Sequence, residues 1–472
     1  KFDEHSIAFE YGTDKDDGDL IGPGGALWGE DTPFFTHANQ IQSTSTTSQS
    51  FFPLFSALID VENYIDYFVL QTYIQNTDWM GIAWGLNNVK IFRASEEHKW
   101  EYLLYDTDAG LGFFGANAYQ NYIQNARYPN SPNVHSNLFD HVLDNWEFRH
   151  RFINRYADLV NTIFQPWAFN TQTTIAVNQI EAAMPHHIER WNSPGSYAAW
   201  LNAVNNMINH NEQRVGTSRD HLMTSFNLSD DHECTLDVFP PLTGLVRINT
   251  IPPGPLPWDG IYFEDCPVEI EAIAQPGYLF EKWDVNAHVE SGDMAEFEKL
   301  NEVALHSSDL YRARFQPCPE DATATIATTA NGLAITTENI PYVDSVAWHL
   351  DGTWIGTEVT WWPGEAGDYH AVVYFDGCTA ETASTFSESL GAFDVVYTNP
   401  SLNLWPNPTA GSFQCEPVPG YGIEVVDVRG RLVAAFDANS CASVPTLSTK
   451  NWPEGIYIVR SGPISNKLVV QR

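Results

Sequence analysis

The sequence is poor in basic residues. Its 472 residues include 23 Lys and Arg against 60 Asp and Glu, which gives a formal net charge of −37. A surface this acidic repels phosphate backbones and anionic lipid, so we expect no nucleic-acid partner. The same charge suits an extracellular protein or one that binds divalent cations.

Long apolar runs are also missing. No stretch approaches the 18 or so uninterrupted apolar residues of a membrane-crossing helix, so we predict no transmembrane segment. The chain starts at Lys1, and no basic segment followed by an apolar one comes after it. We therefore expect that a signal peptide has been removed or lies upstream.

Several catalytic motifs are absent. The sequence contains no GxSxG nucleophile elbow and no HExxH helix. The glycines at 22–25 lack the lysine of a phosphate-binding loop and indicate a turn. Serine-hydrolase, zinc-protease and P-loop chemistry are therefore not expected.

All six cysteines lie after residue 230, and no two of them form a CxxC motif, which disfavours a zinc ribbon or a thioredoxin motif. An even set in a β-rich region favours disulfides formed in an oxidising compartment. We predict three pairs, since each then closes a loop within or beside one module; free buried thiols are the alternative. The pairs are Cys234–Cys266, Cys318–Cys378 and Cys415–Cys441.

Helical patterns dominate the first half of the chain. Apolar residues recur at three- and four-residue steps from Leu58 to Tyr73 and again over 137–226, as in amphipathic helices. Residues 1–50 are polar and rich in turn formers, which predicts loops and short elements. We expect this half, residues 1–230, to be a self-contained α-rich domain.

The composition changes near Ser229 to short alternating runs separated by Pro and Gly, which predict strands. We expect a small β domain over 234–317. About seven short strands with a Trp and a late cysteine predict an immunoglobulin-like sandwich over 318–392. A further β module is expected over 397–472.

Two polar stretches in the first half have the composition of a phosphoryl-transfer site. Asp78 is followed by Asn87 and Asn88, and Asp106 and Asp108 follow a predicted strand over 99–105. Because the two aspartates alternate along the end of that strand, we expect their carboxylates to point the same way. Carboxylate and amide oxygens suit Mg²⁺ better than zinc.

Each residue can be given a part in phosphoryl transfer. Asp78 would orient the attacking hydroxyl as the base, while Asp106 with Asn87 or Asn88 would hold the metal. Asp108 would be a second ligand or an organiser. The alternative is that Asp78 caps a helix end and that the later aspartates form a calcium or turn site.

Residues from about Ile59 to Leu228 resemble the spore-coat CotH kinase family, which are secreted atypical kinases with a protein-kinase-like fold. The resemblance implies that Asp78 is the catalytic-type residue and that Asp106 binds the metal, with Asn88 the better of the two amides. It also implies Mg²⁺ and ATP as cofactors, and a protein or surface glycan as acceptor. The matching segments are 59–68, 76–78, 87–93, 99–112, 184–191 and 219–222.

The chain departs from the protein-kinase pattern in two ways. Eight residues separate Asp78 from Asn87, where protein kinases have about four between the corresponding positions. No glycine-rich loop followed by a strand lysine precedes residue 50. We therefore expect the α-rich (α+β) domain to be the carboxyl-terminal lobe of a kinase-like fold whose first lobe lies upstream.

The last segment resembles the type IX secretion sorting domain of Bacteroidetes-type bacteria. The matching stretches are 404–411, 425–433, 455–460 and 467–470, and the Arg429–Gly430 pair is expected at a hairpin turn. The resemblance implies a β-sandwich, the type IX secretion machinery as a partner, and a secreted or surface-anchored product.

The β domain over 234–317 resembles the small β repeats of bacterial surface proteins, through matches in 244–283. Such modules are spacers or adhesive units. The preferred hypothesis is a secreted CotH-like kinase followed by all-β modules. The alternative is a non-catalytic surface adhesion or structural protein with a degenerate kinase-like domain.

Overall fold

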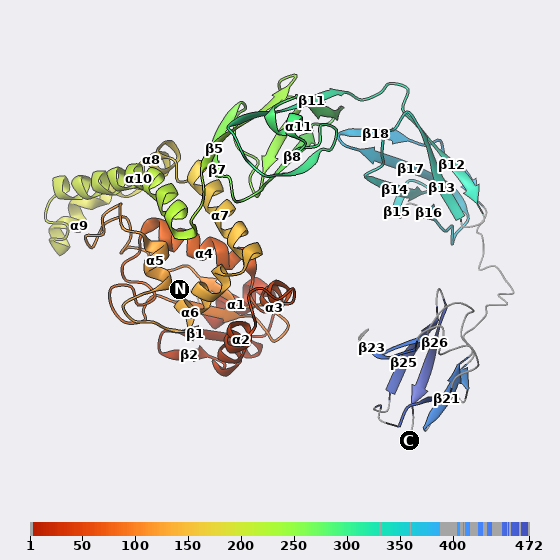
Figure 1. Ribbon diagram of the computed structural model, residues 1–472, viewed down its shortest axis with the longest axis horizontal. Coiled ribbons are helices and arrows are strands. Elements are labelled where there is room, and N and C mark those ends of the chain that lie inside the picture. Colours follow the sequence, from red (N-terminus) through yellow and green to blue (C-terminus); the bar gives the residue numbers. More distant parts are fainter. Residues whose placement is uncertain are drawn as a thin grey trace. The chain divides into compact units, whose positions relative to one another are not determined.

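A computed structural model gives the fold of the chain (Figure 1). Contacts divide it into two compact units, of which the first comprises Lys1–Ala322, Ile340–Asp344 and Tyr374–Thr379 and the second the remainder. The structure describes residues 3–329, 332–358 and 360–387, and in the C-terminal segment residues 404–405, 409, 411–415, 423–427, 432–436, 446–450, 452, 455–461 and 464–470.

The first unit begins with a four-stranded antiparallel sheet in the order β2-β1-β3-β4. Residues 1–50 supply two of its strands, β1 and β2, so the short elements predicted there are confirmed. Ile7, Leu20 and Phe92 form a small buried cluster on this sheet. The elements are α1 (Glu4–Tyr11), a 3-10 turn (Lys15–Asp17), β1 (Asp19–Gly22), β2 (Gly25–Trp28), α2 (Thr32–Ser43), α3 (Phe51–Leu58), β3 (Lys90–Arg93) and β4 (Glu101–Leu103).

Both predicted helical zones are helical. α4 (Val61–Ile74) begins at Asp60, whose side chain accepts from the Asn63 N–H, and it ends at Gln75 in the left-handed conformation. Its aromatic face packs on the later helices, with Phe68 stacked on Phe139 at a ring-centroid distance of 4.1 Å. These helices are α5 (Tyr122–Arg127), α6 (Val134–Leu143), α7 (Trp146–Asn161), α8 (Pro166–Ile180), α9 (Met184–Trp191) and α10 (Tyr197–Phe226), with a 3-10 turn at Glu181–Ala183.

The small β domain consists of two sheets, ordered β10-β8-β6 and β7-β5-β11-β9, with β5 and β11 parallel. The alternating run at 278–283, one of those that predict strands in this region, forms β9 with the same bounds. The elements are β5 (Asp231–Phe239), β6 (Gly244–Ile248), β7 (Trp258–Phe263), β8 (Val268–Ala274), β9 (Tyr278–Trp283), α11 (Ala287–Ser291), β10 (Leu300–Val303) and β11 (Asp309–Pro317).

One hydrophobic core runs from the helices into this β domain. The expectation that the helical half is self-contained is therefore wrong. Polar side chains of α7 complete the joint. Asn161 donates to the Ile261 carbonyl at 2.8 Å and accepts from the Ile261 N–H at 3.1 Å. The buried Asp158 carboxylate accepts from the Tyr262 hydroxyl and from the N–H and hydroxyl of Thr250.

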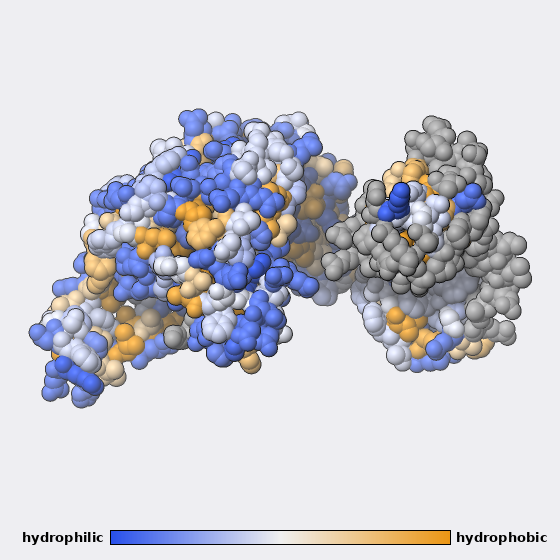
Figure 2. All heavy atoms as spheres, turned by 90° about the horizontal axis from the view of Figure 1, so that it is seen from below, coloured by the Kyte–Doolittle hydropathy of each residue, from blue (hydrophilic) through white to orange (hydrophobic). Residues whose placement is uncertain are grey.

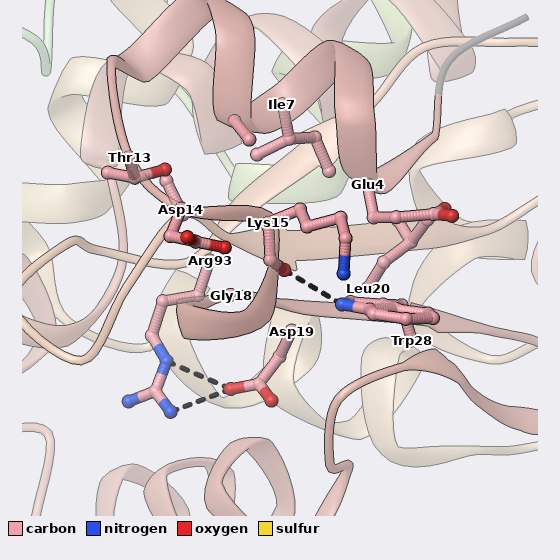
Figure 3. Close-up of a pocket in the computed structure, with 12 residues that line it drawn as sticks. Glu4, Ile7, Thr13, Asp14, Lys15, Gly18, Asp19, Leu20, Trp28 and Arg93 are labelled. Atoms are coloured by element: carbon pink, nitrogen blue, oxygen red, sulfur yellow. Dashed lines mark hydrogen bonds and ion pairs between the residues drawn. The ribbon is translucent and has the colours of Figure 1, made fainter.

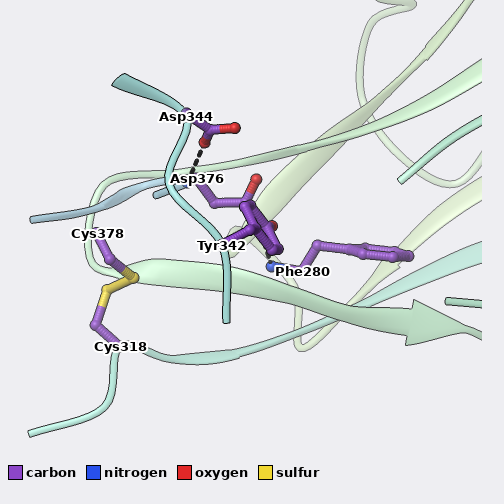
Figure 4. The surroundings of a disulfide bond; sticks show 6 residues. All are labelled: Phe280, Cys318, Tyr342, Asp344, Asp376 and Cys378. Carbon is purple, nitrogen blue, oxygen red and sulfur yellow. Dashed lines mark hydrogen bonds between the residues drawn. A yellow bond between two sulfur atoms is a disulfide. The ribbon is translucent and has the colours of Figure 1, made fainter. Parts of the chain in front are cut away.

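Of the three predicted disulfides, Cys318–Cys378 is present, with a Cα–Cα distance of 5.7 Å (Figure 4). The Cys234–Cys266 prediction is wrong, because both are buried free thiols. Cys234 lies opposite Gly260 in the β5–β7 pairing, whereas Cys266 follows Phe263, which lies opposite Asp231. Three strand residues span about 10 Å, well beyond the reach of a disulfide. Cys415 is buried in β21 (Ser412–Cys415), and its predicted partner Cys441 lies outside the described residues, so that pair stays a prediction.

The strands that follow form a three-stranded sheet, β12-β13-β16, and a five-stranded sheet in which β19 pairs with β17 beside the path β15-β14-β17-β18. Trp348 is fully buried, and its indole N–H donates to the Glu358 carbonyl at 2.7 Å. The strands are β12 (Thr323–Thr329), β13 (Gly332–Glu338), β14 (Ser345–Leu350), β15 (Thr353–Gly356), β16 (Thr360–Trp361), β17 (Gly367–Phe375), β18 (Cys378–Glu381) and β19 (Thr385–Ser387).

The C-terminal module has two sheets, β20-β21-β24 and β23-β22-β25-β26, which share one core that includes Phe413 and Val425. The predicted hairpin is confirmed by the antiparallel β22–β23 pair, whose turn at 429–430 lies outside the described residues. The remaining strands are β20 (Leu404–Trp405), β22 (Ile423–Asp427), β23 (Leu432–Phe436), β24 (Thr446–Ser448), β25 (Gly455–Ser461) and β26 (Ile464–Val470).

None of the helices described here combines the length and apolar character needed to cross a membrane. Hydrophilic residues cover much of the face drawn in Figure 2, with smaller hydrophobic areas between them.

Candidate functional site

The candidate site is assembled where the end of α4 meets the loop after β4. The N–H and hydroxyl of Thr77 both donate to the Ala109 carbonyl, at 3.2 and 3.1 Å. Leu111 N–H donates to the Ile74 carbonyl on the same side. These bonds attach the loop that carries Asp106 and Asp108 to the residues just before Asp78.

Asp78 is held by both predicted amides. The Asn87 Nδ2 donates to the two carboxylate oxygens of Asp78 at 2.9 Å each. The Asn88 Nδ2 donates to the Asp78 carbonyl at 2.8 Å and to its Oδ2 at 3.2 Å. Asn88 is buried, whereas Asn87 is exposed and Asp78 half-buried. The loop between them is closed by the Met80 N–H, which donates to the Asn87 carbonyl at 3.1 Å.

Asp106 and Asp108 lie beyond the strand that was expected to carry them. β4 ends at Leu103, so the predicted strand over 99–105 is too long and strand alternation does not orient the carboxylates. Asp106 instead has a φ of 52°, in the left-handed region. The pKa of Asp106 is raised by partial desolvation, by its contact with Asp108 and by the negative charge of Asp78. Asp106 is therefore close enough to Asp78 and Asp108 for their charges to raise its pKa.

Left-handed backbone is concentrated in these loops. Gln75, Met80, Asn88, Asp106 and Leu111 all have φ between 50° and 58°. Side chains with a Cβ disfavour this region, and such conformations gather at functional sites, where the surrounding contacts enforce them. The Thr77–Ala109 and Met80–Asn87 bonds supply that enforcement here.

Tyr105 and Lys90 were given no role from the sequence, although both lie in segments that resemble the family. The Lys90 Nζ is 4.5 Å from the centroid of the Tyr105 ring. The pKa of the Tyr105 hydroxyl is raised by burial and by the charges of Asp106 and Asp78. Lys90 thus brings a positive charge to the ring beside the carboxylates. Its place at the start of β3, two residues after Asn88, was the available signal.

The donor set fits a hard cation, although it is not a closed cage. Carboxylate and amide oxygens are the ligands that Mg²⁺ prefers. The pKa of Asp106 is raised by desolvation and then by the charges of Asp108 and Asp78, and a cation would relieve the repulsion among these charges. Among the described residues, only Asp3, Glu4 and His5 form a group of three such side chains with ligand atoms all within 4.8 Å. A cation at this loop would therefore be held by the carboxylates of Asp106 and Asp108 together with an amide oxygen such as that of Asn88.

A small hollow elsewhere in this domain is not a ligand site. It lies between α1 and the sheet, beside the buried Asp19–Arg93 ion pair and Lys15, which sits over Trp28 (Figure 3). Its volume of about 10 Å³ admits at most about one water molecule. It holds no room for a nucleotide.

Comparison with known families gives one match in the N-terminal half of the chain and another at its C-terminal end. Residues 30–217 match the family model described as CotH kinase protein, so this part of the chain is a CotH kinase domain. The match begins within the segment before α2, upstream of the motifs that carry the resemblance.

Residues 403–471 match the secretion system C-terminal sorting domain. The chain is thus a CotH-like protein that the type IX secretion system handles and delivers to the cell surface or the outside.

Other comparisons add little. No curated protein matches the chain. Among solved structures, BcpA, the major pilin subunit of Bacillus cereus, aligns at 8% identity over 51% of this chain and 95% of its own, with a TM-score of 0.13. That likeness carries no argument about fold or function.

Proposed function

We propose that this protein is an atypical kinase that transfers the γ-phosphate of ATP to a hydroxyl on an extracytoplasmic acceptor, either a protein or a surface glycan. The observation that carries the proposal is the meeting of Asp78 and its two asparagines with the Asp106–Asp108 loop. These residues lie far apart in sequence, and the Thr77–Ala109 bonds bring them together.

Asp78 is the residue proposed to receive the proton of the acceptor hydroxyl. Its carboxylate is held in one orientation by amide groups, which carry no charge of their own. A base must be fixed within hydrogen-bond reach of the hydroxyl that it serves, and the Asn87 and Asn88 bonds restrict its rotation.

Asp106, Asp108 and the Oδ1 of Asn88 are the proposed holders of Mg²⁺. The Asn88 Nδ2 is already committed to Asp78, so its Oδ1 is the atom left for a metal. Mg²⁺, when bound with ATP, offsets the negative charge of the phosphate that is transferred. Lys90, beside Tyr105, adds a positive charge that favours the approach of phosphate.

A second function is a surface adhesion or structural role with a degenerate site. It is favoured by the Asn87 amide, which occupies both carboxylate oxygens of Asp78, and by the absence of a three-carboxylate cluster in this part of the described chain. On this reading the acidic loop binds calcium or only stabilises the turn. The β modules would then carry the function.

Labelled ATP with Mg²⁺ and the full-length protein separates the two functions. We expect Asp78→Ala and Asp106→Ala each to abolish phosphate incorporation, while Asp17→Ala, an exposed aspartate on the 3-10 turn, leaves it unchanged. Incorporation that survives both site substitutions would overturn the kinase proposal. If the wild-type protein incorporates no phosphate, the result would favour the adhesion or structural role over the kinase role.

We further propose that residues 318–392 are an immunoglobulin-like sandwich and that the source is a Bacteroidetes-type bacterium. The two sheets and the buried Trp348 support the first proposal, and the sorting domain supports the second. Because ATP is scarce outside the cell, the kinase proposal requires phosphorylation before the protein crosses the outer membrane, which favours a protein over a surface glycan as the acceptor.

A further inference from the structure

A large cleft lies in the first unit, where α4 and α7 face the sheet β10-β8-β6. The cleft has a volume of about 780 Å³ and is lined by residues of these two helices and of the β domain. Sites for small ligands commonly measure about 300–1,000 Å³ and occur where domains meet. Its lining residues on α4 lie at 61–66, so about 15 Å of helix separates them from the segment at 76–78.

One wall of the cleft is an uncovered aromatic side chain. Trp146, the first residue of α7, is 62% exposed, and its ring contacts only the edge of His150 among the ring pairs of the described residues, at 5.8 Å. The apolar side chain of Ile65 lies in the same lining. An indole face that stacks on no other ring in the described part of the chain is available to stack on a ligand.

The arginines of the cleft are already neutralised by carboxylates. Arg155 makes two bonds to Asp66, at 2.6 and 3.0 Å, and a third to the Thr250 hydroxyl at 2.8 Å. Arg247 bonds both Glu271 and Glu269 at 2.8 Å.

The third arginine, Arg151, bonds Glu147 at 3.0 Å. Each pair offers donors and acceptors side by side, which is the pattern that a sugar hydroxyl, itself donor and acceptor, can bind.

The remaining charge of the cleft is negative. Glu62 and Glu302 line it, and neither forms an ion pair with another residue of the described structure. With a net charge of −37 on the whole chain, the local potential disfavours phosphates, acidic glycans and other anions. A neutral polyhydroxylated ligand meets no such barrier.

We propose that this cleft binds a neutral oligosaccharide, with one sugar ring stacked on Trp146 and its hydroxyls bonded to the arginine–carboxylate pairs. This site is separate from Asp78 and does not depend on phosphoryl transfer. It would hold the exported protein to a glycan at the cell surface or outside.

Calorimetric titration of the full chain tests the proposal. The probes are cellohexaose, mannohexaose and chitohexaose as neutral oligosaccharides, with an oligogalacturonate and hexalysine as the anionic and cationic alternatives. We expect at least one neutral probe to bind, and Trp146→Ala to weaken that binding about tenfold or more. Trp167→Ala, which removes another exposed tryptophan outside the cleft, should change affinity less than about twofold.

Folding is checked by the thermal unfolding midpoint of each variant, and Trp146→Phe should recover part of the affinity because it restores a stacking face. Asp78→Ala should bind the sugar as the wild type does, which keeps this test distinct from the kinase test. Three results would overturn the proposal: no neutral probe binds up to about 10 mM, Trp146→Ala binds unchanged, or only the charged probes bind.

Discussion

The Asn87 amide donates to both carboxylate oxygens of Asp78, at 2.9 Å each, across a loop of eight residues. The number of residues between Asp78 and Asn87 is larger than between the corresponding residues of protein kinases. The loop nevertheless folds back, so that the Asn87 amide contacts the Asp78 carboxylate. Asn88, the next residue, fixes the Asp78 backbone from the buried side.

Asn88 has two separable roles, and two substitutions distinguish them. Its φ of 50° is unfavourable for a residue with a Cβ, while its amide anchors Asp78. We expect Asn88→Ala to lower the free energy of unfolding by about 1 kcal/mol more than Asn88→Gly, which accepts this φ freely. Urea denaturation measures both variants. Equal stability of the two would show that the left-handed backbone is not enforced.

Besides desolvation, the charge of Asp108 should contribute to the raised pKa of Asp106. Removing it with Asp108→Asn is expected to lower the pKa of Asp106, since a neighbouring carboxylate disfavours its ionised form. Mg²⁺ should lower the same pKa in the wild type. NMR titration of selectively ¹³C-labelled aspartate reads both effects, with Asp17→Asn as the control. An Asp106 pKa that does not respond to Mg²⁺ would contradict metal binding at this loop.

Asp158 should make the joint between helices and β domain sensitive to pH. Burial raises its pKa to about 6, above the value of about 3.9 in an unfolded chain, despite four hydrogen bonds to its carboxylate. The folded state therefore holds the proton more tightly. This contribution to stability is complete below pH ~4 and is lost as the pH rises through ~6, by about 2–3 kcal/mol.

Asp158→Asn removes this titration. The difference in unfolding free energy between wild type and variant should shrink as the pH rises from about 4 to about 6. The exposed Asp220→Asn serves as the control and should show no such trend. A difference that is constant over this range would show that Asp158 keeps an ordinary pKa in the fold.

The Cys318–Cys378 bond should stabilise the end of the first unit. It closes a loop of 60 residues, for which chain entropy predicts about 4 kcal/mol. Lys299 bonds Asp344 and Asp376 close by, at 3.0 and 2.9 Å. We expect Cys378→Ser to lower the urea midpoint, and dithiothreitol to lower that of the wild type but not of the variant. Equal sensitivity of both proteins to the reductant would assign the effect to another bond.

Cys234 and Cys266 should behave as buried thiols. Burial raises the pKa of the Cys266 thiol to about 12 and that of the Cys234 thiol further still, so neither is a ready nucleophile. A thiol reagent should label both only after unfolding in urea, without reductant. Mass spectrometry of non-reduced peptides gives the count, and a Cys234–Cys266 peptide pair would contradict the structure.

The candidate site shows which of its features can be predicted from the amino-acid sequence. The identities of Asp78, Asn88 and Asp106 follow from the chemistry of oxygen ligands and from a family pattern, and the structure brings these residues together. Their orientation does not follow, since strand alternation was the wrong reason. Asp106 itself has a left-handed backbone in the loop after the three-residue strand β4, and no local pattern marks that conformation.

The sequence by itself determined the helical zones, strands such as Tyr278–Trp283 and the sorting domain, because these follow from side-chain periodicity and contiguous motifs. Only the tertiary structure decided what depends on residues remote in sequence. It paired Cys318 with Cys378 but not Cys234 with Cys266, and it joined α7 to the β domain through one core. Strand register and the packing of distant surfaces set those distances, and a linear pattern carries neither.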